Sequence, residues 1–437
     1  MKNKKTIGVI SLGCDKNRVD TEKMLSFLGE YQLVNQTEEA QILIINTCAF
    51  LQSSREEALS EIFKAGQLKA NGKVEKIIVT GCLPQKFITE IFDELPEADA
   101  FLGISDYDKI ASVIERIYKG ERVNEVGLPR KECGKNRVRT TAHYSYLKIA
   151  DGCSNHCTYC LIPSIRGAYR SVPLNDLIEE TKMLGEVQEL ILVAQDVTAY
   201  GKDLNDGSNL PLLIQKLSKL DNVKGIRLLY CYPENVTQEL IDEIKTNDKV
   251  IKYLDIPFQH ADNTVLKRMN RRGTREEYLS LVKKLKEEIN GIAIRSTFIT
   301  GFPGETEQAF ENLLSFVEQA NIFNVGFFKY SREEGTPAYK LKDQVLERVK
   351  QKRLEKLYAK AYELAQINLG QMVGQTITVM AEGFDESAMT YYGRAYFNAP
   401  DIDGKVYFFS VDEVEYGKHY QVKITLNEEY DLYGERL

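Results

Sequence analysis

The sequence has no tryptophan, no long hydrophobic run and no N-terminal segment with the pattern of a signal peptide. The missing tryptophan decides nothing about function. A membrane helix needs roughly 18 consecutive apolar residues, and no stretch of the chain reaches that length. Residues 1–20 hold only a six-residue, weakly apolar run before polar residues. We therefore expect a cytoplasmic protein with no membrane partner, in a compartment where thiols stay reduced.

Cysteine is scarce, with eight residues in a chain of 437. In a large protein of a reducing compartment, cysteines at regular spacings indicate metal binding or catalysis rather than disulfides. At roughly 150 residues per domain, a chain of this length should form about three domains. Hydrophobic residues make up 43% of the chain, which is enough to give each domain a core.

Net charge is missing from most of the chain. The protein carries −7 in all, and residues 371–437 hold five Lys and Arg against twelve Asp and Glu, so the remainder is balanced. A domain that grips RNA should present Lys and Arg to the phosphates. The acidic C-terminal segment instead suits a basic protein partner, although a merely solvated acidic surface would have the same composition.

The pattern of apolar runs predicts an α/β multidomain protein. Residues 1–122 alternate short apolar runs with amphipathic helical segments, which is typical of an open, flavodoxin-like sheet. The basic, polar segment 123–140 is interpreted as a linker. Residues 141–368 contain six strand candidates separated by helices and a charged helix at the end, which favours a partial (β/α)6 barrel with an exit helix. Residues 371–437 are β-rich and broken by turns, as in a small OB-like β-barrel.

One loop in the middle region places three cysteines at the spacing C-x3-C-x2-C, namely Cys153, Cys157 and Cys160. A zinc site with His156 as fourth ligand is one interpretation, but structural zinc usually takes two separated ligand pairs. Three thiolates from one loop suit a 4Fe–4S cluster that has one iron open to a substrate or cofactor. We predict a cluster at this loop and keep zinc as the alternative.

A second set of cysteines lies in the N-terminal region. Cys14, Cys48 and Cys82 are separated by 34 residues each, and each comes at the carboxyl end of a predicted strand. Because such ends meet at one edge of an open α/β sheet, the three thiols should converge and could bind a second cluster. The alternative is that they are small buried residues. Cys133 and Cys231 have no evident partners and are predicted to be structural.

The loop "DGCSNHCTYC" resembles the radical S-adenosylmethionine superfamily, whose open iron binds S-adenosylmethionine and whose C–S cleavage yields a 5′-deoxyadenosyl radical. Tyr159 occupies the position at which that superfamily usually has an aromatic residue near the adenine. Residues that follow predicted barrel strands, where that superfamily contacts its cofactor, are further candidates for binding it; these are Gln195, Asp196, Gln259, Arg295, Gly301 and Gly304. A purely structural role is the alternative for each. His260 is either a neighbour of the substrate or a core histidine with satisfied hydrogen bonds.

Two cysteine triads on a flavodoxin-like domain, a radical barrel and a small TRAM-type β-barrel resemble the methylthiotransferase family over essentially the whole chain. Segments such as "SLGCDKNRVDTE", "NTCAFLQSSREE" and "NAPDIDG" are similar to its protein-modifying branch, the RimO family. The resemblance implies methylthiolation of an aspartate β-carbon in ribosomal small-subunit protein 12, with two 4Fe–4S clusters and S-adenosylmethionine. The N-terminal cluster would carry the sulfur.

The same resemblance implies an electron donor such as flavodoxin or ferredoxin, and a sulfur donor. Two alternatives remain open for the function. One is methylthiolation of a transfer-RNA adenosine by the other branch of the family, which the acidic C-terminal segment makes the less favoured substrate. The other is a non-catalytic, metal-bearing factor that binds the ribosome. We predict the ribosomal-protein enzyme.

Overall fold

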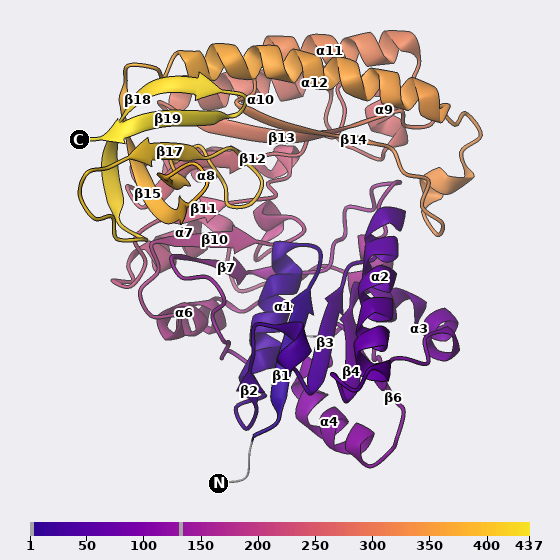
Figure 1. Ribbon diagram of the computed structural model, residues 1–437. Coiled ribbons are helices and arrows are strands. Elements are labelled where there is room, and N and C mark those ends of the chain that lie inside the picture. Colours follow the sequence, from indigo (N-terminus) through magenta and orange to yellow (C-terminus); the bar gives the residue numbers. More distant parts are fainter. Residues whose placement is uncertain (1–3, 131–133) are drawn as a thin grey trace.

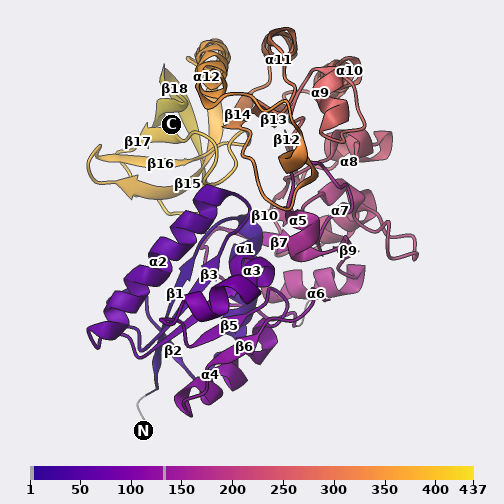
Figure 2. The same ribbon diagram turned by 90° about the vertical axis from the view of Figure 1, so that its right-hand side faces the viewer.

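The computed structural model describes residues 4–130 and 134–437. Its N-terminal part is a six-stranded parallel sheet in the order β2-β1-β3-β4-β5-β6, with helices on both faces (Figures 1 and 2). The predicted open, flavodoxin-like sheet is confirmed. The strands are β1 (Thr6–Ser11), β2 (Gln32–Leu33), β3 (Ile42–Thr47), β4 (Lys76–Gly81), β5 (Ala100–Leu102) and β6 (Val123–Glu125), and the helices are α1 (Asp15–Ser26), α2 (Gln52–Ala70), α3 (Cys82–Glu94) and α4 (Ile110–Tyr118).

The central strand β3 shows why this sheet forms. All six of its residues are buried, as expected of a parallel strand that is covered on both faces. Because successive side chains point to opposite faces, Leu43 and Ile45 enter one hydrophobic cluster and Ile42 and Ile44 enter another. The sheet therefore has a core on each side.

The middle part is an open parallel sheet of six strands in the order β14-β13-β12-β11-β10-β7. These strands coincide with the six candidates of the sequence, and the predicted partial barrel is confirmed. The long helix α12 packs beside α11 and the edge strand β14 (Figure 1). The strands are β7 (Tyr144–Lys148), β10 (Glu189–Val193), β11 (Ile226–Leu228), β12 (Val250–Asp255), β13 (Ala293–Thr300) and β14 (Asn324–Lys329), and the short pair β8 (Ala150–Asp151) and β9 (Arg170–Ser171) lies beside them. The helices are α5 (Ile162–Arg166), α6 (Leu174–Met183), α7 (Leu210–Ser218), α8 (Gln238–Thr246), α9 (Asn263–Arg268), α10 (Arg275–Glu288), α11 (Glu307–Ala320) and α12 (Glu347–Gly370).

The C-terminal part is a closed barrel in the order β15-β16-β17-β19-β18, which confirms the predicted small β-barrel. It packs against the first strands of the middle sheet, because Tyr146, Ile191 and Leu229 share one hydrophobic cluster with barrel residues such as Val379 and Phe397. The strands are β15 (Thr376–Asp385), β16 (Thr390–Arg394), β17 (Val406–Phe409), β18 (His419–Glu428) and β19 (Asp431–Arg436).

The segment interpreted as a linker contributes to both of its neighbours. Its first residues form β6, which pairs with β5 in the N-terminal sheet. Further along, the backbone N–H of Thr140 donates to Glu22 Oε1 of α1 over 2.9 Å, and Arg139 donates to the carbonyl of Glu186 in the middle part over 2.7 Å.

Within the described residues, no helix has both the length and the apolarity to cross a bilayer.

Candidate active site: two cysteine triads around one cavity

Three cysteines of the N-terminal part follow three neighbouring strands. Cys14 comes shortly after β1, Cys48 directly follows β3, and Cys82 opens α3 directly after β4. Since β1, β3 and β4 lie side by side, their carboxyl ends bring these distant residues together. The packing is close: a Cβ added at Gly13, whose φ is +88°, would lie 2.8 Å from the Cβ of Cys48. Only glycine allows this approach. We call these three residues the N-terminal triad.

The second triad, the loop triad, consists of Cys153, Cys157 and Cys160 between β8 and α5. Gly152 turns the chain into this loop with φ +77°, where a Cβ would lie 2.1 Å from the carbonyl oxygen of Ala168. The backbone N–H of Asn155 donates to Cys153 Sγ over 3.5 Å, and that of Ile162 donates to Cys160 Sγ over 3.4 Å. The loop therefore orients two of its own thiols through its backbone.

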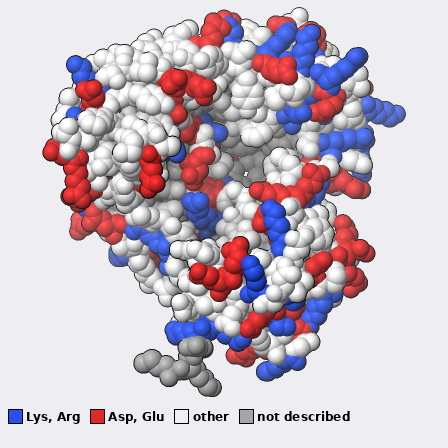
Figure 3. Space-filling model, in the orientation of Figure 1, with Lys and Arg blue, Asp and Glu red and all other residues white. Residues whose placement is uncertain are grey.

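Both triads line a single cavity of about 500 Å³, a size typical of cofactor and ligand sites. Figure 3 shows the molecule hollowed where the N-terminal part meets the middle part. Among the described residues, no group of three His, Cys, Asp or Glu side chains is close enough to hold a single metal ion. His156, the candidate fourth zinc ligand, is exposed. Structural zinc usually takes four ligands, and each triad offers three thiols.

Burial dominates the electrostatics of the thiols. It raises the pKa of Cys82 and of Cys160 to about 12 and that of Cys153 to about 11, and it raises the pKa of Cys14 despite the nearby ammonium group of Lys16. At neutral pH, these four groups are therefore protonated in the metal-free protein. A metal centre that binds them must displace their protons, so its assembly is coupled to proton release.

Three residues predicted to bind the cofactor line the cavity, namely Tyr159, Gln195 and Gln259. Gln195 donates its amide N–H to Asp151 Oδ1 over 3.1 Å, while its Oε1 is buried and has no partner among the described residues. Gln259 has a left-handed backbone with φ +73°. Its N–H donates to the carbonyl of Thr297 over 2.8 Å, which fixes the segment against β13.

The other four residues predicted to bind the cofactor lie outside the part of the cavity wall that the described residues form. Asp196 is buried and accepts a hydrogen bond from Asn155 Nδ2 over 2.9 Å, so it supports the loop triad from behind. Arg295 forms ion pairs with Asp255 at 3.1 Å and with Asp403 at 3.4 Å. It thereby connects the middle sheet to the C-terminal barrel.

Gly301 and Gly304 both have positive φ angles and lie against long side chains. An added Cβ would approach Lys350 Cγ to 2.3 Å at Gly301 and Arg268 Nη1 to 2.4 Å at Gly304. His260 is fully buried and contacts Glu305 Oε2 over 3.3 Å, and it accepts the backbone N–H of Asp262 over 2.9 Å. It has the contacts of a core histidine.

Sequence reasoning missed Arg271, which lines the cavity beside the loop triad. Its guanidinium stacks on the ring of Tyr232, 3.9 Å from the centroid, and donates to the carbonyl of Pro257 over 2.8 Å. Its Nε is buried without a partner among the described residues. Burial next to the cavity distinguishes it from its neighbour Arg272 in the sequence "NRRG", and no local pattern indicates which of the two is buried.

Arg166 and Cys231 also line the cavity. Arg166 was visible in the sequence as the single charge in "LIPSIRG" after the loop triad, but its partners come from another part of the chain. Cys231 is fully buried, and its backbone N–H donates to the carbonyl of Asp255 over 2.8 Å. Cys133 lies outside the described residues.

The polar atoms of the cavity fit S-adenosylmethionine and clusters. Each triad offers three thiols, which leaves one iron of a cubane without a protein ligand. Among the described residues, no donor reaches Gln195 Oε1 and no acceptor reaches Arg271 Nε. A ligand with both an ammonium group and a carboxylate would complete both, because buried polar groups are nearly always hydrogen-bonded.

Parallel-sheet core, cysteine loop and cavity together define a radical S-adenosylmethionine enzyme. Residues 147–317 match the model of the radical SAM superfamily, residues 6–103 match that of the uncharacterized protein family UPF0004, and residues 373–437 match that of the TRAM domain. The fold is similar to the cobalamin- and [4Fe-4S]-bound radical methyltransferase TsrM from Kitasatospora setae, with a TM-score of 0.56, 13% identity and 77% of each chain covered. It is also similar to the radical enzyme OxsB, with a TM-score of 0.51 and 13% identity over 83% of this chain and 58% of that one.

Among curated proteins, the chain is 46% identical to the ribosomal protein uS12 methylthiotransferase RimO of Thermoanaerobacter sp., over 99% of this chain and 100% of the relative. It is 45% identical to the protein of that name from Lachnoclostridium phytofermentans, over 97% and 98% of the two chains. The chain therefore belongs to the RimO family of methylthiotransferases. It is an enzyme that uses S-adenosylmethionine and iron–sulfur clusters, which sets aside the non-catalytic alternative.

Proposed function

We propose that this enzyme methylthiolates the β-carbon of an aspartate in ribosomal protein uS12. The names of its relatives give uS12 as the protein that they modify. In this proposal, the loop triad binds the cluster that activates S-adenosylmethionine, and the N-terminal triad binds the cluster that carries the sulfur. One observation carries it: all six cysteines, from two parts of the chain, line the same cavity. A single substrate carbon can then meet the radical and the sulfur without leaving the site.

When bound, the clusters and S-adenosylmethionine supply one-electron reduction, hydrogen abstraction and methyl and sulfur transfer, and the protein supplies orientation and shielding. Gln195 Oε1 is available to accept a hydrogen bond from the ammonium group of the methionine moiety, and Arg271 Nε is available to donate to its carboxylate. Tyr159 and Tyr232 contribute aromatic wall next to them. Asp196 holds the loop by accepting from Asn155.

The acidic C-terminal barrel supports a protein substrate rather than transfer RNA. Its loop 410–418 has Asp412, Glu413 and Glu415 exposed, and Val411, directly before them, is 88% exposed. Figure 3 shows acidic groups along the edge formed by this barrel. Phosphates would be repelled by such a surface, whereas a basic ribosomal protein would be attracted to it. The proposal places the enzyme in the cytoplasm, with flavodoxin or ferredoxin as electron donor and a separate sulfur donor.

The proposal is tested with the purified protein, reconstituted under anaerobic conditions and supplied with S-adenosylmethionine, a reductant and sulfide. Free uS12, small ribosomal subunits and transfer RNA are offered in parallel, and the products are analysed by mass spectrometry. We expect a methylthio group on one aspartate of uS12 and an unmodified transfer RNA. Efficient modification of an adenosine with no change in uS12, free or assembled, would refute the substrate assignment.

A further inference from the structure

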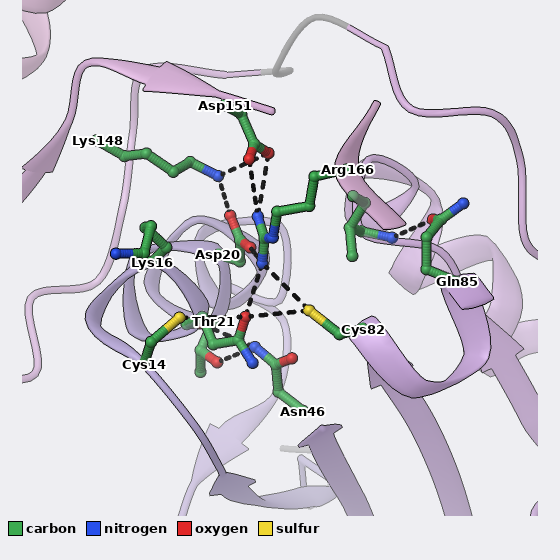
Figure 4. A network of polar contacts seen from close by, with 12 residues as sticks. Cys14, Lys16, Asp20, Thr21, Asn46, Cys82, Gln85, Lys148, Asp151 and Arg166 are labelled. Carbon is green, nitrogen blue, oxygen red and sulfur yellow. Dashed lines mark hydrogen bonds and ion pairs between the residues drawn. The ribbon is translucent and has the colours of Figure 1, made fainter. Parts of the chain in front are cut away.

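Arg166, the last residue of α5, reaches from the radical loop into the N-terminal part (Figure 4). Its Nη1 donates to both carboxylate oxygens of Asp151, over 3.1 and 3.0 Å. Its Nη2 donates to Asn17 Oδ1 over 2.7 Å, to Asp20 Oδ2 over 3.0 Å and to Cys82 Sγ over 3.7 Å. One guanidinium thus contacts Asp151, two residues before the first cysteine of the loop triad, and a thiol of the N-terminal triad.

Asn17 accepts a hydrogen bond from Arg166, and its side chain contacts the chain near each cysteine of the N-terminal triad. Its Nδ2 donates to the carbonyl of Leu12 over 3.0 Å and to that of Thr47 over 3.1 Å, beside Cys14 and Cys48. Its Oδ1 lies 3.8 Å from Cys82 Sγ and 4.0 Å from Cys14 Sγ. Through the amide of Asn17, Arg166 therefore positions the segments that follow β1, β3 and β4. It also contacts Cys82 directly.

The charges around Arg166 are buried and balanced. Arg166 and Lys148 face Asp20 and Asp151, and the exposed fraction of each of these side chains is between 1% and 8%. A buried ion-pair network of this kind is weak evidence for added stability, because desolvation offsets most of the attraction. Its position suggests a role at the cavity instead. In this network, Arg166 donates to a thiol, Cys82 Sγ.

A guanidinium suits this place better than an ammonium group would. It offers five donors in a rigid, planar fork and remains charged at any accessible pH. It can therefore meet Asp151 on one side and Asn17, Asp20 and Cys82 on the other, without titrating when a cluster assembles. Cationic donors next to cluster sulfur stabilise the reduced, more negative state and so raise the reduction potential.

We propose that Arg166 is a positioning residue of the N-terminal cluster: it donates to Cys82, fixes the triad through Asn17, and raises the reduction potential of the cluster bound there. This inference rests on the proposed assignment of the N-terminal triad as cluster ligands. It concerns how the sulfur-carrying site is connected to the radical loop, and it holds whichever molecule proves to be the substrate.

The test compares reduction potentials in the full-length protein with both clusters, by redox titration monitored by electron paramagnetic resonance. The signal that changes on addition of S-adenosylmethionine belongs to the loop triad, and the other belongs to the N-terminal triad. For Arg166→Gln, the ratio of reduced to oxidised N-terminal cluster at a fixed potential should fall about tenfold, which for one electron is about 59 mV. Arg166→Lys, which returns the charge, should recover most of this change.

Arg227→Gln is the matched control. Arg227 has 1% of its side chain exposed, like Arg166, and it joins two parts of the chain, because it pairs with Glu189 and donates to the carbonyl of Tyr396. It lies outside the cavity wall that the described residues form. Its replacement should leave both potentials unchanged.

Asp20→Asn keeps the test decisive if Arg166→Gln fails to fold or to bind iron. It removes the carboxylate 3.0 Å from Arg166 Nη2, so the N-terminal potential should rise rather than fall. Potentials that match the wild type in Arg166→Gln, or in Asp20→Asn where the first variant fails, would overturn the inference. If the assigned signal survives replacement of Cys14, Cys48 and Cys82 by Ala, then the ligand assignment itself is wrong, and this inference fails with it.

Discussion

The two triads reach the same cavity by different means. The loop triad occupies eight consecutive positions, and the backbone N–H groups of Asn155 and Ile162 donate to two of its thiols. The N-terminal triad takes one cysteine from beyond the carboxyl end of each of three strands, and the side chain of Asn17 contacts the chain at all three places. Arg166 then connects this triad to the middle part of the chain.

The difference concerns what each site depends on. A site made by one loop and its own backbone should tolerate substitutions elsewhere, provided that the loop keeps its glycine turn. A site assembled from three strand ends and a buried polar network should be sensitive to residues that never touch a metal, because a partly broken buried network is costly. The following predictions test this contrast, in order of decreasing effect.

The largest effect is expected from removing the loop triad. Replacing Cys153, Cys157 and Cys160 by Ala should remove about half of the iron and all cleavage of S-adenosylmethionine, since no open iron would remain there. Iron analysis and chromatography of 5′-deoxyadenosine measure both. Cys231→Ala is the control, because Cys231 lines the same cavity and should be dispensable. Formation of 5′-deoxyadenosine by the triple variant would contradict the assignment.

Removing the N-terminal triad should separate the two activities. With Cys14, Cys48 and Cys82 replaced by Ala, the protein should lose about half of its iron and retain some reductive cleavage of S-adenosylmethionine. It should form no methylthiolated product, because the sulfur carrier is gone. Circular dichroism checks that the sheet remains folded. Full product formation by this variant would exclude the N-terminal site as sulfur carrier.

Asn17→Ala tests whether the N-terminal triad depends on a residue that is not a metal ligand. It leaves the carbonyls of Leu12 and Thr47 and the guanidinium of Arg166 without this partner, and we expect a loss of about 2 kcal/mol in unfolding free energy. Iron should leave the N-terminal cluster faster in the presence of a chelator, while cleavage of S-adenosylmethionine changes little.

Asn209→Ala is the control for that experiment, because Asn209 caps α7 by accepting the backbone N–H of Leu212. Its loss should cost about 1 kcal/mol without any effect on iron release. Equal rates of iron release in the two variants would show that the contrast between the triads is wrong.

The smallest effect on the chemistry is expected from the C-terminal barrel, none of whose described residues lines the cavity. Reversing Asp412, Glu413 and Glu415 to Lys should slow association with uS12 and reduce its dependence on salt, since exposed charges are screened beyond about 10 Å at 0.1 M salt. Cleavage of S-adenosylmethionine should be unchanged. Binding kinetics at several salt concentrations measure the effect.

Reversal of Glu311, Glu318 and Glu363 on α11 and α12, which are also exposed, is the matched control and should leave uS12 binding intact. A transfer-RNA enzyme would respond in the opposite sense, because added lysines on the barrel would strengthen its grip on phosphate. Tighter transfer-RNA binding by the barrel variant, with methylthiolation of that RNA by the unmutated enzyme, would overturn the substrate proposal.

Local pattern was enough to predict most elements of the fold. The six strands of the middle sheet were visible because each is a short apolar run between amphipathic helices. Strand β6 was missed, because its three residues, Val123–Glu125, have no apolar pattern and become a strand only by pairing with β5. The cofactor residues were predicted from their places after strands, and the structure brings Tyr159, Gln195 and Gln259 to the cavity but not Arg295.

By itself, the sequence determined the loop triad and the three-part architecture, since spacing within one loop and apolar periodicity are local properties of the chain. It also determined that the net charge lies in the last 67 residues. Only the tertiary structure decided that both triads line one cavity and that Arg166, 84 residues from Cys82, donates to its thiol. Such contacts depend on which strand ends and helices meet in space, and no spacing along the chain encodes that.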